Sequence, residues 1–302
     1  MIDRHPREIE SEAHFRAYLL GTRRLYVGPE LMDTTWIPRT RAWEVLFWFL
    51  LNPERPFLAE TLVEQLWPEV HHERAVSTFQ VCVHAVRRAI EPSLSSRCES
   101  RFLRRHSNNV YSFEPGDQWW TDVAEVEMLD RTGHHYERAG DTIRARYYYR
   151  RVAGHVAQGH LLLNDDWPWV HPYRERLRQL CLRSLNRLML LEEDDGTDED
   201  LLEAAHLSLN LEPRNHMAVK AQVLQFLMRE DCVSATARLD EHFDGLHREL
   251  GLRPPEEFLR LRQVLSGPAP SSAAGRRDIL LAFAGRGPDS FKLRKARQIG
   301  VA

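Results

Sequence analysis

The sequence predicts a mainly helical protein with a small β-sheet near its N-terminus, a β-hairpin around residue 108 and an array of helices behind them. Three observations support this fold class: a short-strand pattern over residues 15–36, amphipathic helical spacing over residues 40–90, and a helical pattern from Trp120 onward. A chain of 302 residues with 43% hydrophobic residues has enough apolar material for two cored domains, so a single minimal module is excluded.

Charge is distributed unevenly along the chain. The whole chain has 41 basic and 44 acidic residues, which excludes a non-specific nucleic-acid coat. Residues 71–115 carry 7 basic and 4 acidic groups, residues 118–265 carry 19 and 26, and residues 266–302 carry 7 and 2. Positive charge is therefore modest and local in the first part, and it returns in the C-terminal tail.

The first predicted elements are short antiparallel strands within residues 15–36. Their β-branched and aromatic residues are interrupted by Gly21, Gly28 and Pro29, which are typical of tight turns. We expect a small antiparallel sheet.

Two helices are predicted next, across a tight connection. The first has Thr40 as its N-cap and ends at Asn52–Pro53, and the second covers residues 58–66. Trp67–Pro68 ends the second helix, because proline cannot continue a helix and restricts the residue before it.

A third helix is predicted over residues 73–90. Its apolar stripe has helical spacing and consists of Val76, Phe79, Val83, Val86 and Ile90. The opposite face points outward and consists of Arg74, Ser77, Thr78, Val81, His84, Ala85 and Arg88, with Arg87 at its edge.

A basic β-hairpin follows the third helix. Asn108–Asn109 tolerates the positive φ of a hairpin turn, and arginines lie on the strand before it. Strands, three helices and a basic hairpin within about 100 residues follow the order of a winged helix-turn-helix, whose third helix enters the major groove of DNA. Hydroxyls, imidazole and guanidinium groups bind base edges or phosphates, and valine contacts the thymine methyl. The predicted DNA-binding residues are Arg74, Ser77, Thr78, Val81, His84, Arg87, Arg88, Arg101, Arg104, Arg105 and Asn108.

The rest of the chain predicts an all-α, tetratricopeptide-like helical-repeat domain. Residues 208–213 (SLNLEP) and 249–254 (ELGLRP) are similar helix-end phrases, as expected for drifted repeats. A flexible basic tail is predicted for residues 267–302. The predicted helices cover residues 123–139, 141–158, 168–191, 198–209, 214–228, 232–250 and 255–265.

Four stretches resemble the antibiotic regulatory protein (SARP) family of transcriptional regulators. They are PFLAETLVEQLWPEVHHERAVSTFQVCVHAVRRAI at residues 56–90, DDWPWVHPYRERLRQLCLRSLNRL at residues 165–188, AAHLSLNLEPRNHMAV at residues 204–219 and HRELGLRPPEEFLRL at residues 247–261. The resemblance covers about residues 15–265. It implies an OmpR-type winged helix over residues 1–116 and a bacterial transcriptional activator domain over residues 117–266.

The resemblance also implies partners. Family members bind repeated promoter elements side by side, so double-stranded promoter DNA, RNA polymerase and a second copy on DNA are expected partners here. One position departs from the family: relatives commonly have arginine where this chain has Ala85.

Two functions from different classes follow. The leading interpretation is a sequence-specific transcriptional regulator, an activator that recruits RNA polymerase. The alternative is a tetratricopeptide-like interaction scaffold with a degenerate winged-helix dimerisation module, motivated by Ala85 and the small local charge.

The sequence contains no motif that is typical of an enzyme, a cofactor site or a metal site. GxSxG, HExxH, GxGxxG and GxxxxGK[ST] are all missing from the sequence, so neither an enzyme nor a cofactor is expected. His71–His72 and His134–His135 are adjacent pairs whose side chains point to different faces of a helix, so no metal site is expected.

Localisation is expected to be cytoplasmic. Cys82, Cys98, Cys181 and Cys232 are scattered without a CxxC pair, as for reduced thiols. The sequence contains neither an apolar signal region nor a run approaching the ~18 apolar residues of a membrane span.

Overall fold

The computed structural model describes residues 12–266 except residues 34, 38, 96, 97, 196 and 230, so the predicted tail lies outside the described residues. The chain divides into two compact units that are not consecutive in sequence. The first contains Met1–Arg131 and Gly154–Leu180, and the second contains Thr132–Ala153 and Cys181–Ala302. The predicted domain boundaries at residues 116/117 and 266/267 stay predictions.

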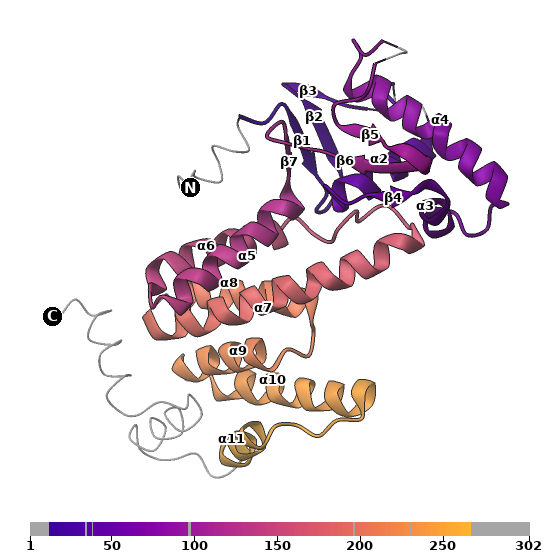
Figure 1. The fold of residues 1–302 in the computed structure, drawn as a ribbon. Helices are drawn as coiled ribbons and strands as arrows, with labels where there is room; N and C mark the ends of the chain where they lie inside the picture. The colour runs from indigo at the N-terminus through magenta and orange to yellow at the C-terminus, as the bar shows by residue number, and fades with distance from the viewer. Residues whose placement is uncertain are drawn as a thin grey trace. The chain divides into compact units, whose positions relative to one another are not determined.

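A four-stranded sheet opens the first unit (Figure 1). The predicted antiparallel part is confirmed, because Phe15 of β1 faces Val27 of β2. β7 adds to β1 in parallel, with Phe15 opposite Trp119 and their rings stacked at 4.3 Å between centroids. The predicted helical pattern from Trp120 is therefore wrong at its start, since these buried aromatic residues extend the sheet. In sheet order the strands are β3 (Glu30–Leu31), β2 (Arg24–Val27), β1 (Phe15–Tyr18) and β7 (Trp119–Thr121).

The three predicted helices of the first unit are confirmed. Thr40 is the first helical residue and Arg39 is the extended N-cap, so the predicted cap is wrong by one position. Residues 42–50 are all buried, which makes the first of these helices the central one. The three helices are α2 (Thr40–Leu51), α3 (Ala59–Leu66) and α4 (His72–Ile90).

The predicted hairpin is confirmed as the wing. Asn108 and Asn109 have φ of 57° and 55°, the left-handed conformation that asparagine tolerates better than most residues. A strand that the sequence did not predict joins it, because Phe57 pairs with Tyr111 just before α3. In sheet order the strands are β4 (Phe57–Leu58), β6 (Val110–Phe113) and β5 (Leu103–Arg105).

Residues 154–180 pack against this winged helix within the first unit. The side chains of Asn52 and Tyr173 exchange hydrogen bonds of 2.8 and 3.0 Å. The Trp48 and Trp169 rings meet edge to face at 5.3 Å. Two chain segments about 120 residues apart in sequence thus share one aromatic core.

One close backbone approach and one buried carboxylate add further contacts within the first unit. Gly21 has φ of 70°, and a Cβ there would lie 2.2 Å from the Gln158 carbonyl oxygen, so a side chain cannot be accommodated. The buried Asp122 carboxylate accepts the backbone N–H groups of Leu19 and Leu20 at 2.8–2.9 Å. Burial raises the pKa of Asp122 to about 6 against the opposing effect of those hydrogen bonds.

The helices that follow confirm the predicted all-α part, with ends shifted by a few residues. α5, α6 and α7 contribute to both units, and within the second unit α9 packs with α8 and α10 (Figure 1). Thr197, Asn215 and Asp231 cap α8, α9 and α10 through side-chain oxygens. The helices are α5 (Asp122–Arg138), α6 (Thr142–Val156), α7 (His171–Asp195), α8 (Asp198–Leu211), α9 (His216–Met228), α10 (Cys232–Gly245) and α11 (Glu256–Ser266).

The predicted helix over residues 232–250 changes character before its end. α10 continues as one π-helical turn, Leu246–Leu250, which stops at Gly251 with φ of 62°. A left-handed glycine is a common helix terminator, because it has no Cβ to clash. The core beneath this region contains Val219, Leu239 and Phe258.

Candidate nucleic-acid interface

The core-facing side of α4 differs from the predicted stripe by a rotation of roughly 40°. Val76, predicted in the stripe, is only half-buried, while Ala75, Cys82 and Ala89 are buried. α4 packs against α2 and α3, and three of its buried residues are small, so counting only large apolar residues misplaces the centre of the buried face. The buried residues of α4 are Ala75, Phe79, Cys82, Val83, Val86, Ala89 and Ile90.

The rotation changes which side chains face outward. Thr78 and Ala85 lie at the flank and are half-buried, whereas Gln80, which sequence reasoning missed, is exposed. If Ala75, Cys82 and Ala89 are counted as core residues, the helical period places Gln80 on the exposed face from sequence alone. Five predicted site residues of α4 are exposed in the structure: Arg74, Ser77, Val81, His84 and Arg88.

The Arg87 guanidinium is engaged within the protein. Its Nε and Nη2 both donate to the Leu103 carbonyl oxygen, at 2.9 and 2.6 Å, across from the helix to the first wing strand. The side chain is half-buried, and burial lowers the pKa of its guanidinium. Arg87 thus connects α4 to β5, while its neighbour Arg88 is exposed.

The Thr78 hydroxyl is also engaged within the protein. Its Oγ1 donates to the Arg74 carbonyl oxygen at 2.8 Å, one turn earlier in α4. This back-bond is common for threonine within helices. It leaves the oxygen lone pairs, but not the proton, for another partner.

The predicted wing residues are all exposed, as the sequence suggests for phosphate contacts. Arg105 donates to Asn109 Oδ1 at 2.6 Å, within the turn. Arg101 stacks over the ring of Phe102, and its guanidinium lies 3.9 Å from the Asp117 carboxylate. The four exposed residues are Arg101, Arg104, Arg105 and Asn108.

Helix and wing belong to one packed body. The rings of Phe79 in α4 and Tyr111 in β6 meet at 5.1 Å, edge to face. The Glu91 carboxylate, just after α4, accepts the Arg101 backbone N–H at 2.8 Å and the Ser100 hydroxyl. The structure therefore brings the two predicted groups of site residues together on the first unit.

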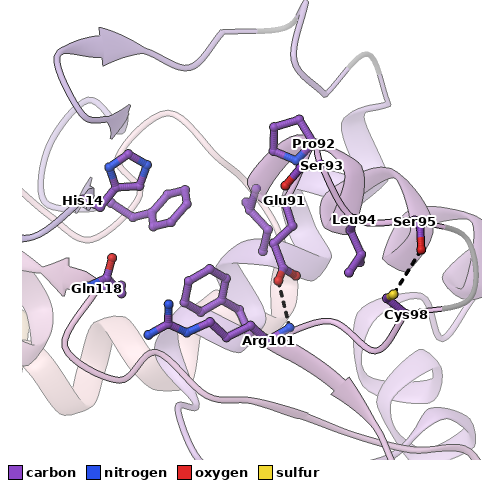
Figure 2. Close-up of a pocket in the computed structure, with 12 residues that line it drawn as sticks. His14, Glu91, Pro92, Ser93, Leu94, Ser95, Cys98, Arg101 and Gln118 are labelled. Atoms are coloured by element: carbon purple, nitrogen blue, oxygen red, sulfur yellow. Dashed lines mark hydrogen bonds between the residues drawn. The ribbon is translucent and has the colours of Figure 1, made fainter.

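A pocket of about 490 Å³ lies where α4 ends and the wing begins (Figure 2). Figure 2 shows the Arg101 guanidinium on the side of His14 and Gln118, and Cys98 at the other end of the pocket. Ser95 Oγ donates to Cys98 Sγ at 3.0 Å. The hydrogen bonds of Glu91 and Ser95 thus hold the pocket wall together.

Metal-binding clusters and membrane-spanning helices are both missing from the described residues. There, no cluster of three or more histidine, cysteine or carboxylate side chains is arranged to hold a metal ion. Burial raises the pKa of the Cys82 thiol to about 11, as for a protonated core residue. None of the described helices combines the length and apolarity needed to cross a bilayer.

Comparison with known proteins gives a structural match. No family model and no curated protein sequence matches the chain. The structure of EmbR from Mycobacterium tuberculosis, in complex with a low affinity phosphopeptide, is similar with a TM-score of 0.67 and 16% sequence identity. The match covers 91% of this chain and 70% of that chain. EmbR is a SARP-family regulator with an OmpR-like winged helix and a bacterial transcriptional activator domain. The chain thus shares the fold of EmbR, a winged helix-turn-helix combined with a helical domain.

Proposed function

We propose that the chain is a sequence-specific DNA-binding transcriptional regulator. One observation carries the proposal: in a regulator fold, the exposed face of α4 and the arginine-bearing wing belong to one packed body. The helix enters the major groove, and the wing contacts the phosphate backbone beside it. Arg74 and Arg88, near the two ends of the helix, bind phosphates together with Arg101, Arg104 and Arg105.

The regulator acts as an activator in this proposal. It binds repeated promoter elements as a homodimer, and its helical part contacts RNA polymerase. Support comes from the fold of EmbR, which combines the same two kinds of domain.

Fluorescence anisotropy against the chain's own upstream DNA tests the proposal. We expect a preference of at least ~10³ over shuffled DNA. Five exposed arginines predict a slope of log affinity against log salt of about −4 to −5 per protomer, because each phosphate contact contributes about −0.9.

A pair of variants assigns the binding to the interface. Arg88→Ala weakens binding to specific and shuffled DNA alike and reduces the salt slope by about 1. Arg260→Ala, in the exposed Arg260–Glu256 pair of α11, leaves both unchanged. Weak binding without sequence preference contradicts the regulator and favours the interaction scaffold, for which partner capture from lysate is the next measurement.

A further inference from the structure

The centre of the exposed α4 face is neutral and partly apolar. Val81 is 44% exposed although it lies in the middle of a 19-residue helix. Ser77, Gln80 and His84 are exposed around it. Arginines flank this group at Arg74 and Arg88, and residues 75–86 contain neither arginine nor lysine.

This composition limits which bases the helix reads at its centre. Guanine is most often bound by the paired donors of arginine or lysine, which this stretch lacks. Adenine is bound by the paired donor and acceptor of a glutamine or asparagine amide, and thymine by apolar contact with its methyl group. Gln80 and Val81 are the side chains here with those two chemistries.

The structure also shows that two other predicted site residues of α4 already donate their hydrogen bonds within the protein. The Thr78 proton is used within α4, and Arg87 donates to the Leu103 carbonyl. Gln80 and Val81 are consecutive, so their side chains diverge by about 100° around the helix axis and reach neighbouring base pairs.

We propose that Val81 and Gln80 are specificity-determining residues that read A·T pairs at the centre of each half-site. Val81 packs against a thymine methyl group, and the Gln80 amide pairs with adenine N6 and N7. The inference rests on the proposed function, since it names the bases that the same interface selects. The inference also gives a reason for the exposure of Val81, because its isopropyl group is removed from water when DNA binds.

The full chain is first used to select binding sites from random-sequence duplexes. We expect the selected half-sites to centre on A·T pairs. Each thymine of a selected site is then replaced by deoxyuridine, which removes only the methyl group, and each adenine by 7-deazaadenine, which removes only N7. Fluorescence anisotropy measures the affinities.

At least one deoxyuridine substitution per half-site weakens binding about three- to tenfold, the effect of losing one buried methyl contact. Val81→Ala weakens binding to the unmodified site by a similar factor and removes the effect of that deoxyuridine. Gln80→Ala does the same for one 7-deazaadenine. Alanine is the better helix former, so both variants fold.

Val264→Ala in α11 is the matched control, because Val264 is 40% exposed on a helix of the other unit. With the Val264→Ala variant, we expect deoxyuridine substitution to weaken DNA binding as much as it does with the unchanged chain. G·C pairs at the centre of the selected sites, or specific binding that is insensitive to every deoxyuridine and 7-deazaadenine, overturn the assignment of Val81 and Gln80 while the regulator stands. Failure to select any preferred sequence refutes the regulator itself and the readout with it.

Discussion

Adjacent arginines at the end of α4 have different surroundings. Arg87 donates twice to the Leu103 carbonyl, whereas Arg88 is exposed. A charge run in the sequence cannot separate the two, because the carbonyl that binds Arg87 lies 16 residues further along the chain. Their substitutions therefore have separable effects.

Arg87→Ala is expected to lower the free energy of unfolding by about 1–3 kcal/mol, since it leaves a buried carbonyl without its charged donor. Arg88→Ala is expected to change it by less than about 0.5 kcal/mol. Urea denaturation of the full chain measures both. Equal losses for the two variants contradict the bridging role of Arg87.

The residue scale also shows how far the interface is predictable from sequence. Exposure of Arg74, Ser77, Val81, His84 and Arg88 agrees with the helical period. The period fixes angles between residues but not the rotation of the helix as a whole. That rotation is seen only when the small buried residues Ala75, Cys82 and Ala89 are counted with the large apolar ones.

At the scale of elements, the sequence predicts the helices more completely than the strands. A helix forms its hydrogen bonds within itself, so its signal is local. β4 and β7 are two and three residues long, and they pair with β6 and β1 from distant parts of the chain. Nothing within Phe57–Leu58 or Trp119–Thr121 identifies those partners.

The junction of α9, α10 and α11 contains a histidine pair. His216 Nδ1 lies 2.9 Å from His242 Nε2, and the ring of Phe258 packs against both. Burial lowers the pKa of His242 to about 4, helped by His216 and by the positive charges of Arg238 and Arg214. Burial lowers the pKa of His216 as well.

These shifts predict acid sensitivity. The unfolded chain takes up protons near pH 6.5, the ordinary pKa of histidine, while folded His242 resists protonation until about pH 4. The contribution of neutral, buried His242 to stability is therefore complete above pH 6.5 and falls by about 1–3 kcal/mol as pH drops toward 4. His242→Gln is expected to flatten this part of the stability profile in urea melts from pH 4 to 8. An unchanged profile contradicts the assignment to His242.

At the scale of the whole molecule, the core of the winged helix includes residues from a later part of the chain. Trp169 is buried against Trp48, and Tyr173 exchanges hydrogen bonds with Asn52. The first compact unit therefore includes Gly154–Leu180. Order of elements along the sequence does not reveal this, because aromatic residues at helical spacing are equally consistent with packing between repeats.

Trp169→Ala is expected to destabilise the first unit by about 3–5 kcal/mol, the cost of a large cavity. Hydrogen exchange followed by mass spectrometry locates the effect. Amides of α2 lose protection, whereas those of α9 and α10 in the second unit retain it. Loss confined to residues 154–180 contradicts a shared core.

The packing of residues 154–180 against the winged helix also has a consequence for the recombination of domains between proteins of this fold. A recombination event at residue 116 would separate Asn52 from Tyr173 and Gly21 from the backbone of Gln158. A transplanted winged helix would then expose Trp48 and its neighbours to water and tend to aggregate. Under the proposed function, we therefore expect a new DNA sequence preference to arise more readily by substitution on the outer face of α4 than by exchange of whole domains.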